Sequence, residues 1–243
     1  MGNTPILIVE DDAIIAENIR RKLASAGNII PDLVMSGEEA IEKVGEIRPD
    51  LVLMDIGLSG KIDGVEAARQ IRNRFDIPVV YLTAHTDEAT LQRAKLTEPF
   101  GYVSKPFEIS ELRSIIETSL YKHQLEQKLK EREAHFRLLY EEAPLAYQSL
   151  NEDGCLLEVN QAWLDMLGYE RDEVMGCWFG DFLTPKEKSL LEERFPRFKA
   201  EGVVCDVEVD MVRKDGIQIT VSIDGRIGYG RSRAFPANLL APG

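Results

Sequence analysis

The stretch Pro49–Gly60, PDLVLMDIGLSG, decides how the first half of this chain folds. Four consecutive apolar residues precede Asp55, and two glycines follow it. A short apolar run bounded by proline and glycine is typical of a strand buried on both faces of a parallel sheet. Open α/β sheets bind their ligands at the carboxyl ends of such strands. Asp55 is therefore the first candidate for the chemistry of this protein.

Segments with the patterns of strands and helices alternate around this strand. The further strands are expected at 5–9, 29–34, 77–82 and 101–103, and the helices at 13–25, 36–47, 64–75 and 87–96. Apolar residues spaced by four, at Ile15, Ile19 and Leu23, give the first helix one buried face. Five strands alternating with helices predict an α/β domain with a flavodoxin-like, doubly wound, five-stranded parallel sheet.

Polar residues stand where four of these strands end. Glu10 and Asp11 follow the first strand, Asp55 ends the third, Thr83 follows the fourth and Lys105 follows the fifth. In a parallel sheet these ends share one edge, so the five side chains are expected to converge. Three carboxylates repel one another unless a cation joins them, and Mg²⁺ binds oxygen ligands of this kind. A lysine and a hydroxyl beside a metal-bound carboxylate suit phosphoryl transfer.

Residues 5–120 resemble the receiver domain of two-component response regulators. The resemblance is carried by Glu10-Asp11, by Asp55 within LVLMDIGLSG, by the IDG turn at Ile62–Gly64, by Thr83 in YLTAH and by Lys105 in SKPF. It implies that Asp55 is the phosphoacceptor, phosphorylated by a histidine kinase. It also implies that Asp11, Asp55 and the backbone carbonyl of Gly57 ligate Mg²⁺, while Glu10 acts through bound water.

The same resemblance assigns roles to the remaining polar residues. Thr83 would hydrogen-bond the phosphoryl group, and Lys105 would pair with it. Tyr102 would be the aromatic switch that swings inward when Thr83 moves. Lys105-Pro106 would be a cis peptide bond, which is plausible because cis bonds concentrate at X-Pro.

A long segment without glycine or proline, 108–142, follows the last strand. Leu112, Ile116 and Leu120 give its first part a core-facing side. Further along, a weak heptad pattern runs through Leu125, Leu129, Arg132, Phe136 and Leu139. Two interpretations stay open for this part: a solvated connecting helix, or a helix that pairs in parallel with that of a second copy.

The second half has the pattern of an α+β domain with an antiparallel sheet. Strands are expected at 145–150, 155–159, 203–212 and 217–223, and helices at 161–167, 170–175 and 186–200. The segment 133–228 resembles a PAS sensor domain. That resemblance rests on Val159–Ala162, Leu167–Tyr169 and Arg213–Gly216.

The end of this domain departs from the family pattern. Gly225–Gly243 has two prolines and no alternation, so we expect no closing central strand there and an incomplete PAS sheet. We also expect no PAS cofactor. The three histidines, His85, His123 and His135, all precede the region where the sheet and helices of this domain are expected, and the surroundings of Cys177 do not match a flavin-binding motif.

The composition excludes several classes of function. A net charge of −13 argues against nucleic-acid binding, because no basic surplus is available to neutralise phosphates. Three widely spaced cysteines are typical of a reducing compartment. No apolar stretch is long enough to span a membrane, and no signal-peptide pattern is present. These features predict a cytoplasmic protein that binds neither nucleic acid nor membrane.

The sequence therefore predicts a phosphorelay protein with a receiver domain at 1–121, a helical linker at 122–142 and a PAS domain at 143–243. Its partners would be a histidine kinase and a second copy, bound through the linker and the PAS domain. It would not be an enzyme beyond its own phosphotransfer and dephosphorylation. The alternatives are a truncated front portion of a hybrid sensor histidine kinase and an Mg²⁺-dependent aspartyl-phosphate phosphatase. Gly57 stands where such a phosphatase would carry its second acid.

Overall fold

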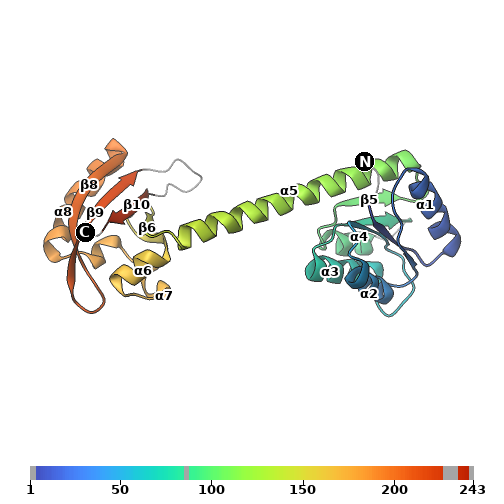
Figure 1. The fold of residues 1–243 in the computed structure, drawn as a ribbon, viewed down its shortest axis with the longest axis horizontal. Coiled ribbons are helices and arrows are strands. Elements are labelled where there is room, and N and C mark those ends of the chain that lie inside the picture. The colour runs from blue at the N-terminus through green and yellow to red at the C-terminus, as the bar shows by residue number, and fades with distance from the viewer. Residues whose placement is uncertain (1–3, 85–87, 227–234, 241–243) are drawn as a thin grey trace. The chain divides into compact units, whose positions relative to one another are not determined.

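The chain forms two compact units, which are described separately. The computed structural model describes residues 4–84, 88–226 and 235–240 (Figure 1). Unit 1 comprises Met1–Lys130 and unit 2 comprises Glu131–Gly243. The boundary between the units falls within one long helix, α5 (Ile109–Glu141).

Unit 1 is the predicted doubly wound α/β domain. Its strands lie in the order β2-β1-β3-β4-β5 and all pair in parallel. The third strand, which contains Asp55, is the middle one and is buried along its whole length. The elements before α5 are β1 (Ile6–Val9), α1 (Ala13–Ser25), β2 (Leu33–Val34), α2 (Gly37–Ile47), β3 (Leu51–Asp55), α3 (Gly64–Phe75), β4 (Val79–Thr83), α4 (Glu88–Lys95) and β5 (Gly101–Ser104).

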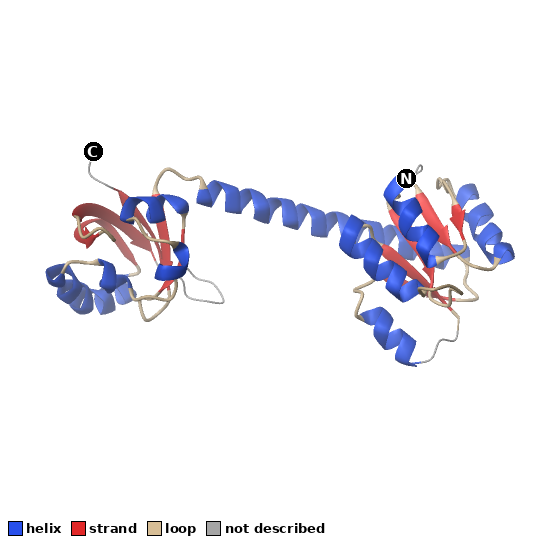
Figure 2. Cartoon of the chain, turned by 90° about the horizontal axis from the view of Figure 1, so that it is seen from below, coloured by secondary structure: helices blue, strands red, loops and turns tan. Residues whose placement is uncertain are grey.

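Side chains alternate between the two faces of this sheet and form two separate cores. Leu7, Val52 and Tyr81 pack with residues of α2 and α3 on one face. Ile8 and Leu53 pack with residues of α1 and α5 on the other. Because helices cover both faces, β3 can be apolar throughout until it ends at Asp55. The layered arrangement of strands and helices is visible in Figure 2.

Two details of unit 1 differ from the sequence prediction. The strand expected at 29–34 is only Leu33–Val34, with a single bridge between Ile29 and Pro5. Pro31 lacks the N–H that a continuous ladder would need. In α1 the buried residues are Ala16, Ile19 and Leu23, whereas Ile15, the first of the three predicted positions, is 36% exposed.

The part of α5 that extends beyond the receiver core is attached to unit 1 by a cluster around Asp76. The Asp76 carboxylate, at the end of α3, accepts hydrogen bonds from Gln127 (2.7 Å) and Lys130 (2.8 Å). Arg72 joins Asp76 (2.9 Å) to Glu126 (3.0 Å). His123 also faces this cluster, with its Nε2 3.9 Å from Asp76 Oδ1 and its side chain 18% exposed. We call these residues the Asp76 clamp.

Unit 2 is an α+β domain whose sheet has the order β7-β6-β10-β9-β8, all antiparallel. Its elements are β6 (Ala146–Leu150), β7 (Leu156–Val159), α6 (Gln161–Leu167), α7 (Arg171–Val174), the 3-10 turn η1 (Phe179–Phe182), α8 (Pro185–Glu201), β8 (Val203–Val212), β9 (Gln218–Arg226) and β10 (Phe235–Leu240).

The expectation that Gly225–Gly243 contributes no central strand is wrong. The strand β10 lies in the middle of the sheet and pairs with both β6 and β9. Pro236 is tolerated because it is the second residue of the strand, and the ladder with β9 begins only at Ala237. The local pattern did not reveal this strand, and one of its two partners, β6, is far away in the sequence.

A fully buried asparagine organises the start of unit 2. Asn160 Oδ1 accepts from the backbone N–H groups of Tyr147 (2.8 Å) and Trp163 (3.2 Å). Its Nδ2 donates to the carbonyls of Tyr140 (3.0 Å) and Leu145 (2.9 Å). Asn160 thereby caps α6, as predicted, and also holds the last turn of α5 to the domain.

Candidate functional site

The polar residues predicted at the strand ends converge at one edge of the receiver sheet. Glu10 follows β1, and Asp55 and Thr83 end β3 and β4. One carboxylate oxygen from each of Glu10, Asp11 and Asp55 lies within 4.8 Å of the others. Glu10 and Asp55 are buried, at 1% and 8% exposed, and Asp11 is the more open member.

Lys105 is the positive centre of this cluster. Its Nζ lies 2.5 Å from Glu10 Oε2 and 2.9 Å from Asp55 Oδ2. The peptide bond that follows it, Lys105-Pro106, is cis, as predicted. The cation offsets part of the repulsion among the three carboxylates, because opposite charges in contact favour the ionised forms.

Burial and charge act together on Glu10 and Lys105. Burial raises the pKa of Glu10 to about 7, although the hydrogen bond from Lys105 lowers it. Burial by itself would lower the pKa of Lys105, but the hydrogen bonds to Glu10 and Asp55 outweigh it and raise the pKa above its usual 10.5. Lys105 therefore stays an ammonium group at neutral pH.

Backbone groups fix the two carboxylates that Lys105 does not fully satisfy. Gly57 N–H donates to Asp55 Oδ1 (3.1 Å), and Ser59 N–H donates to Asp11 Oδ2 (3.1 Å). The loop after β3 must pass close to this strand end. A Cβ at Gly64 would lie 2.0 Å from the backbone oxygen of Asp55, so only glycine fits at that point of the IDG turn.

The residues present fit a hard divalent cation. Glu10, Asp11 and Asp55 offer carboxylate oxygens within reach of one another, and Mg²⁺ takes oxygen ligands from one or two carboxylates while keeping several waters. Asp11, the most open of the three, does not pair with Lys105. The donor set therefore leaves negative charge on the outer side of the cluster, where a cation can bind.

Thr83 and Tyr102 occupy the neighbouring strands β4 and β5. Thr83 is 8% exposed, and its hydroxyl donates to the carbonyl of Val103 (3.5 Å) rather than to the acidic cluster. The Tyr102 ring lies 5.7 Å from that of Tyr81, and its buried hydroxyl has no hydrogen-bond partner among the described residues. Burial also raises the pKa of Tyr102.

Two features of this region were missed at the level of sequence. The direct contact between Lys105 and Glu10 was not foreseen, since Glu10 was expected to act only through water. The Asp76 clamp also went unnoticed, because nothing in the local pattern marks Asp76 except its place after a helix. Its left-handed backbone, with φ of 53°, is typical of a residue just past a helix end.

Comparisons with known proteins agree with this geometry. A model of the response regulator receiver domain matches residues 6–117, and a model of the PAS domain matches 144–227. PdtaR of Mycobacterium tuberculosis, a transcriptional regulatory protein, is 35% identical over 47% of this chain and 56% of its own length. The chain thus spans about half the length of this curated relative.

Two further similarities cover different shares of the chain. The haem response regulator HssR of Staphylococcus haemolyticus is 32% identical over 89% of this chain and 98% of its own length. The receiver domain of a modulated diguanylate cyclase from Desulfovibrio desulfuricans, a solved structure, is 38% identical over 50% of this chain and 97% of its own, with a TM-score of 0.49. None of the described helices is both long and apolar enough to cross a membrane.

On the family models and the near full-length match, this chain belongs to the response regulators of two-component signalling, with a receiver domain followed by a PAS domain.

Proposed function

We propose that Asp55 accepts a phosphoryl group from the phosphohistidine of a histidine kinase, in a reaction that requires Mg²⁺. One arrangement carries this proposal: Lys105 Nζ joins Glu10 and Asp55, while Asp55 Oδ1 accepts from the backbone of Gly57. These contacts hold the carboxylate in one orientation at the rim of the sheet. A preorganised nucleophile and fixed positive charge are what phosphoryl transfer requires of a protein.

Each residue of the cluster has a defined task in this step. An Asp55 oxygen forms the new O–P bond while the P–N bond of phosphohistidine breaks. The electron pair of the P–N bond stays on that nitrogen, and the proton on the other ring nitrogen makes the leaving group a neutral imidazole. Lys105 keeps one charge beside the phosphoryl oxygens. Asp11 would hold Mg²⁺ together with Asp55 and the carbonyl of Gly57, and Glu10 would act through bound water. The bound ion would neutralise charge on the transferred group.

The chain then acts as a phosphoacceptor that carries out its own transfer and dephosphorylation. Thr83 would turn from the carbonyl of Val103 toward the phosphoryl group, and Tyr102 would respond at the next strand. Tyr102 also borders a cleft lined by Arg72, Lys122 and Glu126. A change at Tyr102 can therefore reach the Asp76 clamp and the extension of α5.

Labelling with acetyl phosphate tests the phosphoacceptor. The full chain is incubated with acetyl phosphate and Mg²⁺, and intact mass is measured before and after EDTA treatment. We expect one added phosphoryl group that requires Mg²⁺ and is absent from Asp55→Asn. The matched control is Asp12→Asn, an exposed acid that caps α1 and should label normally. Labelling of Asp55→Asn would refute the assignment.

A second proposal concerns α5, which we propose pairs in parallel with α5 of a second copy. The four apolar residues of the heptad pattern are 48–70% exposed: Leu125, Leu129, Phe136 and Leu139. At 100° per residue they lie on the side of the helix opposite the Asp76 clamp residues 123, 126, 127 and 130. The clamp therefore leaves this apolar stripe uncovered.

Charges flanking the stripe favour the parallel orientation. With Leu129 and Phe136 at position a, Lys128 falls at g and Glu133 at the following e position. In a parallel pair these two positions face each other across the interface, so each copy contributes one opposite-charge contact. Sedimentation equilibrium of the full chain, with and without beryllofluoride, tests the pairing; a monomer in both states would contradict it.

A further inference from the structure

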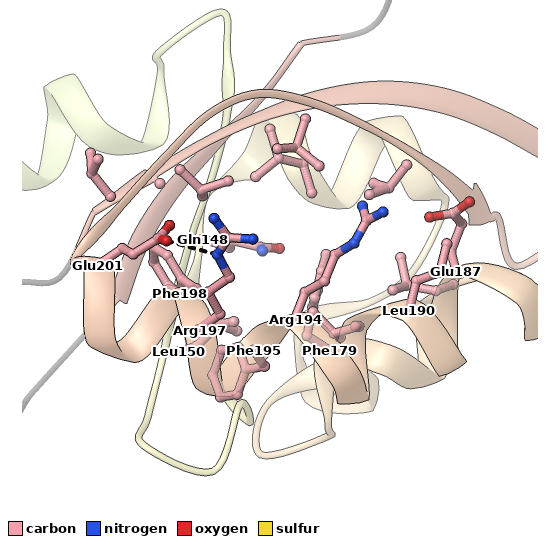
Figure 3. Close-up of a pocket in the computed structure, with 18 residues that line it drawn as sticks. Gln148, Leu150, Phe179, Glu187, Leu190, Arg194, Phe195, Arg197, Phe198 and Glu201 are labelled. Atoms are coloured by element: carbon pink, nitrogen blue, oxygen red, sulfur yellow. Dashed lines mark hydrogen bonds and ion pairs between the residues drawn. The ribbon is translucent and has the colours of Figure 1, made fainter.

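An apolar cavity of about 270 Å³ lies inside the PAS domain, between α8 and the sheet (Figure 3). Leu150, Phe179, Leu190 and Val209 are among the residues that line it. In α8 only Glu187 is buried, so the apolar side chains that this helix turns toward the sheet are incompletely covered. Apolar surface left open in this way favours an apolar occupant.

One deeply buried polar group faces this cavity. Gln148 is 3% exposed, and its Oε1 accepts from the indole Nε1–H of Trp163 (2.8 Å). Tryptophan can only donate, so this bond fixes which end of the amide is the oxygen. The two N–H donors of Gln148 have no hydrogen-bond partner among the described residues, and Gln148 is part of the cavity wall.

The charged residues around the cavity differ in whether they have a partner of opposite charge. Arg197 forms an ion pair with Glu201 (2.7 Å), and Glu187 has Lys186 at 3.5 Å. Arg194 is exposed and makes no hydrogen bond or ion pair with the residues that the structure describes. Figure 3 shows its side chain extending from α8 into the space between this helix and the sheet. The uncompensated charge of the site is therefore one guanidinium.

We propose that this cavity binds an amphipathic monocarboxylate reversibly. Its carboxylate pairs with Arg194 at the mouth, and its apolar body fills the space between α8 and the sheet. A neutral acceptor on that body, such as a carbonyl, accepts from Gln148. The charged end belongs at the mouth because a carboxylate beside Gln148 would be buried without an opposite charge. This site does not depend on the phosphoryl chemistry of Asp55.

The cavity volume limits the size of the ligand. With a water's share of liquid volume at about 30 Å³, a cavity of about 270 Å³ corresponds to a molecule of roughly ten non-hydrogen atoms. Octanoate has this size, and 7-oxooctanoate adds a carbonyl near the end of the chain. The neutral compound 1-octanol matches the apolar body without the charge.

Isothermal titration calorimetry of the full chain with these three probes tests the proposal. We expect saturable binding of octanoate, at least about tenfold weaker binding of 1-octanol, and tighter binding of 7-oxooctanoate than of octanoate. Octanoate that does not bind, or 1-octanol that binds as well as octanoate, would overturn the site. Equal binding of octanoate and 7-oxooctanoate would overturn the role of Gln148.

Variants of two exposed arginines separate the ligand contact from general surface charge. We expect Arg194→Gln to weaken octanoate binding about tenfold, Arg194→Lys to keep part of it, and Arg137→Gln, outside the cavity lining, to leave it within about twofold. Arg194→Gln with unchanged affinity would contradict the proposal. Far-UV circular dichroism checks that each variant folds, and the Asp55→Asn protein should bind octanoate like the parent chain.

Discussion

The receiver and PAS domains place their polar groups in opposite ways. At the receiver site, the parallel sheet brings Glu10, Asp55 and Lys105 together at one edge, where they contact one another directly. In the PAS domain, α8 covers one face of an antiparallel sheet incompletely. An apolar cavity remains between them, with Gln148 and Arg194 as separate hydrogen-bond donors. Converging charges suit covalent chemistry, and an apolar cavity suits reversible binding.

The domains also differ in how they hold the helix that joins them. The first part of α5 packs in the receiver core, but its extension beyond that core is held by side-chain charges, with Asp76, Arg72 and Lys130 all at least partly exposed. The PAS domain holds the last turn of α5 through Asn160, which is fully buried and donates a hydrogen bond to the backbone carbonyl of Tyr140. Exposed ion pairs contribute little stability, whereas buried hydrogen bonds are costly to lose. The contacts of the Asp76 clamp should therefore cost less to break than the buried hydrogen bonds of Asn160.

The largest expected effect is on the chemistry of the charged cluster. Lys105→Met removes the cation beside Asp55, and we expect the initial rate of labelling by acetyl phosphate to fall about a hundredfold, as for loss of one preorganised charge-stabilising donor. The rate is measured by intact mass against time. Lys22→Met, an exposed lysine in the last turn of α1, should label at the normal rate. Normal labelling of Lys105→Met would remove Lys105 from the site.

The next effect tests the buried attachment at the PAS end. Asn160→Ala leaves several backbone groups of β6, α6 and α5 without partners, and we expect the PAS domain to lose about 3 kcal/mol of unfolding free energy. Urea unfolding followed by Trp163 and Trp178 fluorescence measures the change. Gln161→Ala, at an exposed neighbouring position, should cost less than about 0.5 kcal/mol. Equal stability of the two variants would show that Asn160 is dispensable.

Pairing through α5 should depend on one face of the helix only. Leu129→Glu introduces a charge into the apolar stripe, and we expect it to shift dimers to monomers in sedimentation equilibrium by at least about tenfold in dissociation constant. Ala134→Glu adds the same charge on the opposite face and should leave association unchanged. If both variants associate alike, the stripe is not the interface.

The smallest effect is pH-dependent and tests the receiver end of α5. Burial would raise the pKa of Asp76, but hydrogen bonds from Lys130 and Gln127 and the charge of Arg72 outweigh it and lower the pKa below its usual 3.8. His123 also faces the carboxylate, at 3.9 Å. A depressed carboxyl pKa stabilises the fold above the usual value, and this contribution is lost as pH falls through the folded value.

Asp76→Asn should therefore be less stable than the parent chain near neutral pH and equally stable in acid. We expect the difference in unfolding free energy to disappear between about pH 5 and pH 3. Urea unfolding at several pH values measures it, with exposed Asp153→Asn as the control that shows no such dependence. A difference that grows in acid would contradict the assigned direction of the Asp76 pKa.

The two domains also differ in how much the sequence reveals. The receiver strands were predictable because buried parallel strands read as apolar runs that end in polar residues, as at Leu51–Asp55. The convergence of Glu10, Asp11 and Asp55 followed from topology alone. Local pattern could not show β10, which pairs with the distant strand β6, nor the Asp76 clamp, which joins residues about fifty positions apart in sequence. Contacts made by tertiary packing leave no periodic signal.

Borohydride trapping tests the central claim most directly. Sodium borohydride reduces an aspartyl phosphate to homoserine, so the phosphorylated position can be read by peptide mass spectrometry. After treatment with acetyl phosphate and Mg²⁺, we predict homoserine at position 55 and unchanged aspartate at positions 11 and 12, with no conversion when EDTA is present. Two results would contradict the account: homoserine at position 11, or no homoserine at position 55 in a protein whose mass shows an added phosphoryl group.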